Sequence, residues 1–190
     1  MSLNKAALRA EVLARRRTVP PAQAAAFAGH LAHAGCALVT DLRPGIVSAY
    51  FPLAGEPSTL ALLEKLAQEG IQTALPVTGK RGTPLVFRLW QPGEPTVKGQ
   101  MAIEEPLPDA PATAPDLLFV PLAGFDRRGH RIGYGAGFYD RTLAGLRAAK
   151  KICAVGVAYA NQELPGIPDE AHDEPLDFVL TERELIDCRT

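Results

Sequence analysis

Hydrophobic and polar positions along the chain follow two patterns, one typical of helices and one of buried strands. Strong helix formers fill residues 3–17, and within 20–42 Phe27, Leu31 and Leu38 recur at helical spacing. For a helix over 57–70, Ser58 is a candidate N-cap and Gly70 is a candidate stop signal. The predicted helices span residues 3–17, 20–42, 57–70 and 139–150.

Short apolar runs between these helices predict strands. The run PDLLFVPL at 115–122 is apolar on both faces, as a parallel sheet covered by helices requires. Residues 92–115 are rich in proline and lack periodicity, so we expect a long loop with room for a strand turn. The predicted strands are 45–51, 71–77, 84–90, 115–122, 152–159 and 176–181, the last being the final strand of the chain.

This alternation predicts a three-layer α/β/α fold with a mainly parallel sheet. We expect one domain over residues 1–190, with N-terminal helices in 1–42 and the sheet in 45–190. The formal charge of −1 and the pI near 6.4 argue against a nucleic-acid partner held by bulk electrostatics. No apolar run is long enough to span a membrane, and no signal-peptide pattern opens the chain. Three scattered cysteines, Cys36, Cys153 and Cys188, indicate free thiols in a reducing cytoplasm.

Four glycines crowd the segment RRGHRIGYGAGFYDR at 127–141. Glycine loses much conformational freedom on folding, so such a run indicates a sharp bend or close approach of a ligand to the backbone. The segment lies between a predicted strand and a predicted helix, which is the layout of a phosphate-binding loop. It matches neither the P-loop pattern nor the complete dinucleotide pattern GxGxxG. A purely structural surface turn is the alternative.

Charged residues around this loop favour an anion site over a simple turn. Basic residues precede the helix, namely Arg127, Arg128, His130 and Arg131, and they suit phosphate oxygens. Asp140 follows the loop, and the segment 169–177 carries five acidic residues. Magnesium commonly takes one or two protein carboxylates and completes its shell with water and phosphate. For 169–177 the alternative is an ordinary solvated loop.

Other candidates lie outside the loop. Lys5 and Arg9 are four residues apart and therefore leave the same helix face, which is either a binding face or simply a solvated one. Glu56 follows the first strand, a ligand-facing position in an α/β sheet, although many such glutamates only cap a loop. His30, His33 and Cys36 have the spacing of a helical metal site, but no fourth ligand accompanies them.

Four segments together resemble a known family. They are KAALR near the amino terminus, YFPLAGEPST after the first strand, VPLAGFDRRGHRIGYGAGFYDR, and HDEPLDFVLTE near the end. In this order they are similar to the 5-formyltetrahydrofolate cyclo-ligases, also called methenyltetrahydrofolate synthetases. The resemblance covers essentially the whole chain and implies the NagB/RpiA/CoA-transferase-like arrangement of an α/β sheet.

The resemblance implies an ATP- and magnesium-dependent ring closure of 5-formyltetrahydrofolate to 5,10-methenyltetrahydrofolate, with release of ADP and phosphate. The formyl oxygen attacks the γ-phosphate to give an imidate phosphate, N10 attacks the activated carbon, and phosphate leaves. The glycines would let backbone amides approach both the triphosphate and the folate. The implied partners are these small molecules, with no membrane and no nucleic acid, in a cytoplasmic monomer or homodimer.

Site residues carry over by position within the matching segments. Arg131, Tyr134 and Asp140 are implied to be catalytic, and Asp140 with Asp173 to hold magnesium. The implied ATP contacts are Lys5, Arg9, Arg131, Gly133, Tyr134, Gly135, Ala136, Gly137, Phe138 and Tyr139. The implied folate contacts are Phe51, Glu56, Tyr134, Gly135, Ala136, Gly137 and Phe138.

One departure from the family pattern concerns the nucleotide loop, 127–140. Some members carry basic side chains where this chain has Tyr134 and Ala136. Cationic help for the transferred phosphoryl group must then come from one of the three arginines Arg127, Arg128 and Arg131. Two alternative functions stay open: a sugar-phosphate isomerase or CoA-transferase-like enzyme, which needs no ATP, and a non-catalytic folate or nucleotide-binding module.

Overall fold

A mainly parallel sheet forms the centre of the computed structural model, which describes residues 4–189. Within those residues eight strands join in the order β12-β11-β10-β7-β1-β2-β3-β6. The neighbours from β11 to β2 pair in parallel, whereas β12, β3 and β6 pair antiparallel, so the predicted mainly parallel sheet is confirmed. The strands are β1 (Ile46–Ser48), β2 (Gln72–Val77), β3 (Val86–Leu89), β6 (Ala112–Thr113), β7 (Leu117–Pro121), β10 (Cys153–Val157), β11 (Phe178–Leu180) and β12 (Leu185–Asp187).

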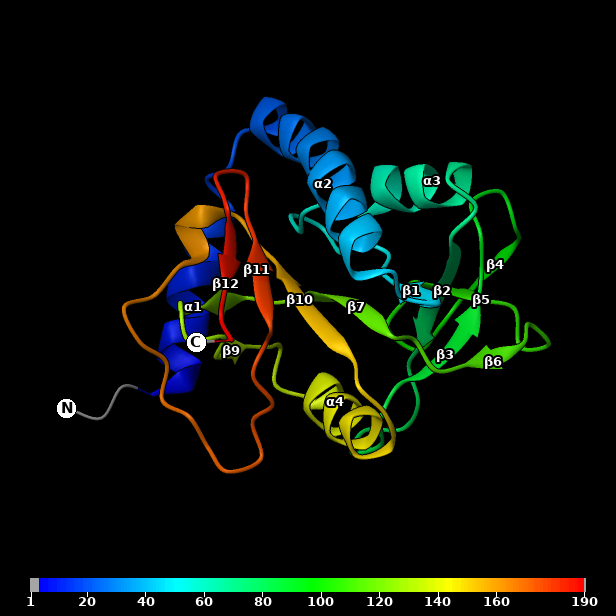
Figure 1. Ribbon diagram of the computed structural model, residues 1–190. Coiled ribbons are helices and arrows are strands. Elements are labelled where there is room, and N and C mark those ends of the chain that lie inside the picture. The colour runs from blue at the N-terminus through cyan, green and yellow to red at the C-terminus, as the bar shows by residue number, and fades with distance from the viewer. Residues whose placement is uncertain (1–3, 190) are drawn as a thin grey trace.

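Helices cover both faces of this sheet, as Figure 1 shows. The helices are α1 (Lys5–Arg16), α2 (Pro21–Leu42), α3 (Leu60–Gln68) and α4 (Phe138–Ala149). On one face α2 and α3 bury a core around Phe119, and on the other α4 buries Leu143 against Leu118 and Val120. This arrangement confirms the predicted three layers. None of the helices in residues 4–189 is long and apolar enough to cross a membrane.

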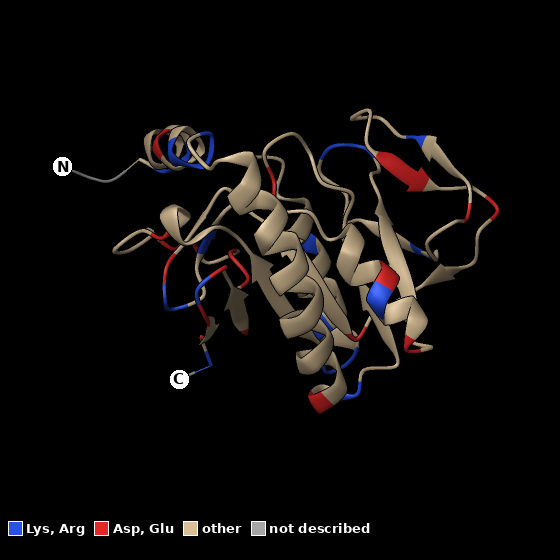
Figure 2. Ribbon diagram, turned by 90° about the horizontal axis from the view of Figure 1, so that it is seen from above, with Lys and Arg blue, Asp and Glu red and all other residues tan. Residues whose placement is uncertain are grey.

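Helix α1 lies outside these layers, beside the hairpin of β8 (Gly124–Phe125) and β9 (Arg131–Ile132). Its apolar side packs Leu8 and Val12 against a separate small core that includes Ile132. Basic and acidic residues both occur on α1, which Figure 2 shows end-on. The helix is therefore docked by its apolar side, and its charged side chains remain available for other contacts.

Three local predictions are corrected by the structure, and the loop prediction for 92–115, which left room for a strand turn, is borne out in part. The N-cap of α3 is Thr59 rather than Ser58, and the Thr59 hydroxyl donates to the Tyr50 carbonyl. The predicted loop 92–115 contains β4 (Thr96–Lys98), β5 (Glu104–Pro106) and β6. The hairpin β8–β9 falls inside the glycine stretch, and β12 follows the strand predicted to be last. These strands are only two or three residues long and pair with neighbours, so they leave no hydrophobic periodicity.

The carboxyl ends of β1, β2 and β7 face the loop that leads into α4. Gly70 ends α3 in the left-handed region, at φ +71°, which confirms the predicted stop and sends the chain into β2. In open α/β sheets such strand ends form the ligand-binding edge. The fold therefore directs attention to the space between these ends and residues 131–140.

Candidate functional site

A cavity of about 170 Å³ opens at this edge of the sheet. It lies between the strand ends, the β4–β5 hairpin and the loop before α4. The lining residues are Tyr50, Phe51, Leu53, Glu56, Pro76, Thr78, Leu85, Met101, Ile103, Glu104, Pro121, Arg131, Gly133, Tyr134, Ala136, Gly137, Phe138, Tyr139 and Asp140. The cavity thus joins Glu56 and Phe51 to most of the predicted nucleotide loop, although these residues lie far apart in sequence.

Glu56 marks one end of the cavity, here called the Glu56 end. Its carboxylate is almost fully buried and accepts the Leu53 backbone N–H at 2.8 Å. The Tyr134 hydroxyl donates to Oε1 of the same carboxylate. Arg16 Nη1 in turn donates to the Tyr134 hydroxyl at 2.5 Å and lies 3.9 Å from Glu56 Oε1. A chain of polar contacts therefore runs from α1 to the buried carboxylate.

Burial raises the pKa of Glu56 above its usual 4.5, although the Tyr134 hydroxyl, the Leu53 N–H and the Arg16 charge each act to lower it. Burial, with the neighbouring Glu56 charge, likewise raises the pKa of Tyr134, which keeps its proton for Glu56. A carboxylate has about four lone-pair positions, and the Leu53 and Tyr134 donors use two of them. One acceptor position per oxygen is left for a ligand with two adjacent donors.

The middle of the cavity is apolar and aromatic. Phe51 packs edge-on against Trp90 with ring centroids 5.4 Å apart. Met101 and Ile103 reach the cavity from the β4–β5 hairpin, which the sequence did not predict. Flat apolar walls of this kind suit a planar ring system.

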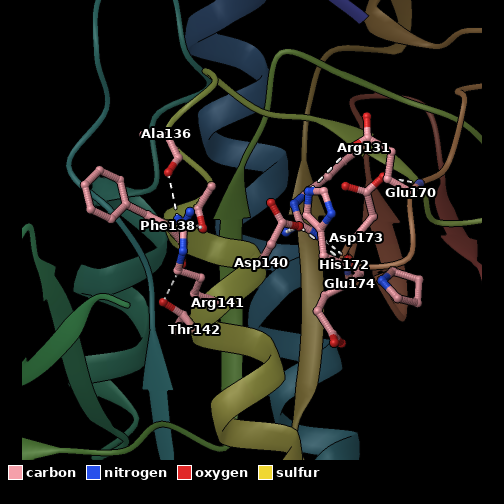
Figure 3. A network of polar contacts seen from close by, with 12 residues as sticks. Arg131, Ala136, Phe138, Asp140, Arg141, Thr142, Glu170, His172, Asp173 and Glu174 are labelled. Carbon is pink, nitrogen blue, oxygen red and sulfur yellow. Dashed lines mark hydrogen bonds and ion pairs between the residues drawn. The ribbon is translucent and has the colours of Figure 1, made fainter. Parts of the chain in front are cut away.

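Asp140 and Arg131 mark the other end, here called the Asp140 end (Figure 3). Arg131 Nη2 donates to Asp140 Oδ1 at 2.5 Å, and Nη1 donates to the Glu174 carbonyl. The Arg131 side chain is 5% exposed, so burial lowers its pKa while the nearby Asp140 and Asp173 charges act to raise it. A guanidinium buried beside carboxylates stays charged, and it is aimed at the cavity from β9.

Lys5 holds the second predicted magnesium carboxylate. Its Nζ lies 2.6 Å from Asp173 Oδ2 and 3.2 Å from Glu170 Oε1. Burial acts to raise the pKa of Asp173, but the hydrogen bond and charge of Lys5, the Glu170 backbone N–H and the His172 charge together outweigh it, and the net shift is downward. Each predicted metal carboxylate is thus paired with a cation, Asp140 with Arg131 and Asp173 with Lys5.

The loop between these ends has glycines in two different conformations. Gly135 and Gly137 take left-handed backbone angles, with φ of +94° and +66°, whereas Gly133 does not. Arg9 Nε donates to the Gly133 carbonyl at 2.6 Å, and Arg141 Nη1 donates to the carbonyls of Ala136 and Gly137 (Figure 3). Arg9 therefore touches the nucleotide loop from helix α1.

Other predicted residues lie elsewhere. Arg127 pairs with Glu163 and Glu184, and Arg128 pairs with Asp126, so of the three candidate arginines only Arg131 lines the cavity. Gly129 belongs to a separate tight turn, where an added Cβ would meet the Leu176 carbonyl oxygen at 2.4 Å. On α2, His33 Nδ1 hydrogen-bonds to the Gly29 carbonyl, and Cys36 is buried in the core.

Arg16 is a charged residue beside the cavity that the sequence did not predict, and Glu104 in the cavity wall is another. A usable signal existed, because Arg16 is seven residues from Arg9 and residues two helical turns apart share one face. Met101 and Ile103 were missed for another reason, since only the unpredicted β4–β5 hairpin brings them to the cavity.

Oxygen donors at the Asp140 end fit a magnesium ion. Within residues 4–189 no group of three or more His, Cys, Asp and Glu side chains is arranged to enclose a metal. Mg²⁺ in phosphate sites keeps several waters and takes only one or two protein carboxylates. Asp140 and Asp173 are carboxylates of this kind.

The fold and the cavity define a class: a three-layer α/β protein with a glycine loop and a charged, ring-sized cavity at its strand ends. Comparison with known proteins identifies the family. The 5-formyltetrahydrofolate cyclo-ligase family model matches residues 1–182. The chain therefore belongs to that family, and the predicted family and enzyme class are confirmed.

Individual relatives agree with this assignment. A 5-formyltetrahydrofolate cyclo-ligase of Mycolicibacterium smegmatis is 34% identical over 96% of both chains. Its Escherichia coli counterpart is 32% identical over 88% of this chain and 94% of its own. The solved 5,10-methenyltetrahydrofolate synthetase of Aquifex aeolicus superposes with a TM-score of 0.82 at 26% identity, over 99% of this chain and 94% of its own. The isomerase or transferase alternative and the non-catalytic alternative are not favoured by any of these matches.

Proposed function

We propose that the chain closes the ring of 5-formyltetrahydrofolate to 5,10-methenyltetrahydrofolate in a reaction that consumes ATP and depends on magnesium. One observation carries this proposal: a single cavity has a buried carboxylate and aromatic walls at one end and a cluster of cations and carboxylates at the other. The Glu56 end suits the folate head group, and the Asp140 end suits a triphosphate.

At the Glu56 end, recognition rests on hydrogen bonding by the carboxylate. The aminopyrimidine edge of a folate presents two adjacent N–H donors, which match the two remaining acceptor positions of Glu56. Phe51 supplies an apolar wall for the ring beside its contact with Trp90. The formyl group of a folate placed in this way would extend toward Gly133, Ala136 and Phe138, which line the rest of the cavity.

At the Asp140 end, Lys5, Arg9 and Arg131 are the cations available to phosphate oxygens. Arg131 is the buried one, and it is the best placed of the predicted arginines to stabilise charge on the transferred phosphoryl group. Asp140 and Asp173 would hold magnesium, which when bound neutralises triphosphate charge. Both carboxylates must then give up part of their present pairing with Arg131 and Lys5.

The proposed chemistry requires the two substrates to meet in one site, and the cavity joins the two ends at which they would bind. The formyl oxygen forms a bond to the γ-phosphorus while the bond to ADP breaks. N10 then forms a bond to the formyl carbon and gives up its proton to the phosphate, which leaves with the former formyl oxygen. Excluding water protects the phosphorylated intermediate, and the aromatic walls contribute to that exclusion. The free thiols of Cys36, Cys153 and Cys188 favour a reducing cytoplasm as the place of this reaction.

An absorbance assay for the methenyl product tests the proposal. We expect product to form only when 5-formyltetrahydrofolate, ATP and Mg²⁺ are all present, with one ADP released per turnover. The variant Glu56→Gln exchanges one acceptor oxygen for a donor and should weaken folate binding by at least tenfold while leaving ATP binding intact. Turnover without ATP, or unchanged folate binding in Glu56→Gln, would contradict the proposal.

A further inference from the structure

We propose that Arg16 is a positioning residue for the folate end of the site, acting through Tyr134 on Glu56. The nucleotide loop carries no cation between Arg131 and Arg141, yet its Tyr134 is held by a guanidinium that comes from α1. This inference rests on the proposed folate role of Glu56 and adds a residue that binds neither substrate directly.

Four contacts fix the Arg16 side chain, which is only 10% exposed. Nη1 donates to the Tyr134 hydroxyl at 2.5 Å and lies 3.9 Å from Glu56 Oε1. Nη2 reaches the Ala54 carbonyl at 3.5 Å, in the turn that presents Glu56. The guanidinium carbon also sits 5.7 Å from the centre of the Tyr134 ring, within the range of a cation–π contact.

These contacts fix which group donates and which accepts along the chain from Arg16 through Tyr134 to Glu56. Because Arg16 can only donate, the Tyr134 hydroxyl accepts from it and must turn its own proton to Glu56 Oε1. Glu56 is thereby held in one rotamer, with its other acceptor positions toward the cavity, and the Arg16 charge acts against the rise in its pKa that burial causes. Without Arg16 the hydroxyl is free to rotate, and a buried carboxylate loses its closest cation.

Helix α1 then serves both ends of the cavity. Lys5 contacts the acidic segment, Arg9 contacts the Gly133 carbonyl, and Arg16 contacts Tyr134. Eleven residues separate the first and last of these cations, which is about 16 Å along a helix. That length spans the loop from the proposed phosphates to the proposed folate ring, so Arg16 should affect only the folate end.

The pH dependence follows from the groups that face Glu56. Ionised Glu56 is the form that accepts two donors, so kcat/KM for folate falls as the pH drops through its pKa. Removing the Arg16 charge raises that pKa further, so the fall begins at a higher pH. The groups facing Glu56 are Arg16, Tyr134, Tyr50 and Tyr139, and the charged groups elsewhere in the cavity wall are Glu104, Arg131 and Asp140.

Steady-state kinetics of Arg16→Met, which keeps an apolar stem of similar length, test the inference. We expect the KM for 5-formyltetrahydrofolate to rise about tenfold, the KM for ATP to change less than twofold, and the acid limb of kcat/KM for folate to move up by about one pH unit. Arg16→Lys, which keeps the charge, should restore the acid limb and recover part of the affinity. Arg17→Met removes a neighbouring exposed charge and should change neither KM.

Direct binding separates this inference from the proposed function. Calorimetry with 5-formyltetrahydrofolate is measured on Arg16→Met, Glu56→Gln, Tyr134→Phe and the double variant of Arg16 and Tyr134. We expect Arg16→Met to weaken binding much less in the Tyr134→Phe background than alone. Lost binding in Glu56→Gln with normal binding in Arg16→Met overturns only the Arg16 role, whereas normal binding in Glu56→Gln overturns the folate assignment itself. Equal rises in both KM values, or a similar effect of Arg17→Met, would show a merely structural effect of Arg16.

Discussion

The glycines of the nucleotide loop differ in backbone conformation and in the space around them, although they lie close together in the sequence. Gly135 and Gly137 have positive φ angles, so alanine at either position is strained whatever ligand is bound. Gly133 has no such angle and lines the cavity, and a Cβ added there would meet no protein atom within 4 Å. Close approach of a ligand to the backbone can therefore be tested at Gly133 without a conformational penalty.

We predict that Gly133→Ala keeps the Tm of the ligand-free wild type but loses most of the Tm increase caused by Mg²⁺ and ATP, because the methyl group occupies ligand space. Gly135→Ala should instead lower the free energy of unfolding by about 1–2 kcal/mol without ligand. Thermal unfolding with and without Mg²⁺–ATP measures both effects. A full ligand-induced Tm increase in Gly133→Ala would contradict a ligand lying close to this backbone.

Elements of the site differ in how far the sequence could predict them. Helix α1 was predictable from its composition, and the spacing of Lys5 and Arg9 placed both on one face. Their partners were not predictable, because Asp173 and Gly133 lie 168 and 124 residues further along the chain. Chain folding, rather than any local pattern, brings such pairs together.

The β4–β5 hairpin is another part of the site that the sequence could not predict. No periodicity predicts it, and a buried side chain, Glu105, anchors it to the sheet. Glu105 Oε1 accepts the Thr78 backbone N–H at 2.9 Å, and its carboxylate lies directly over Gly99. The anchor therefore places Met101 and Ile103 over the cavity, and only the folded chain reveals it.

We predict that Gly99→Ala disturbs this hairpin, because a Cβ there would lie 2.1 Å from Glu105 Cδ. Displacing Glu105 should lower the free energy of unfolding by about 1–3 kcal/mol and raise the KM for folate several-fold, with little change in the KM for ATP. Urea unfolding and steady-state kinetics are the measurements. The control is Gly29→Ala in α2, where a Cβ meets nothing within 4 Å and stability should rise by up to about 1 kcal/mol. An unchanged KM for folate in Gly99→Ala would remove the hairpin from the folate site.

At the scale of the whole molecule, the sheet and the site rest on different apolar clusters. The sheet was predictable because its central strands are apolar on both faces and alternate with helices. Two large cores hold its layers together, whereas α1 is held by the small cluster around Leu8, Val12 and Ile132. The helix that carries Lys5, Arg9 and Arg16 is thus attached separately from the layers that define the fold.

The same substitution, leucine to alanine, should therefore have different effects on activity beneath α1 and beneath α3. Leu8→Ala opens a cavity beneath α1, and Leu66→Ala opens one beneath α3, since both side chains are buried. Each should lower the free energy of unfolding by about 2–5 kcal/mol. We expect Leu8→Ala also to raise the KM for both ATP and folate, because it loosens the helix that contacts both ends of the cavity. Leu66→Ala should leave both KM values near wild type when assayed where each variant is fully folded. Equal kinetic effects at equal loss of stability would mean that α1 docking and sheet packing form one cooperative unit.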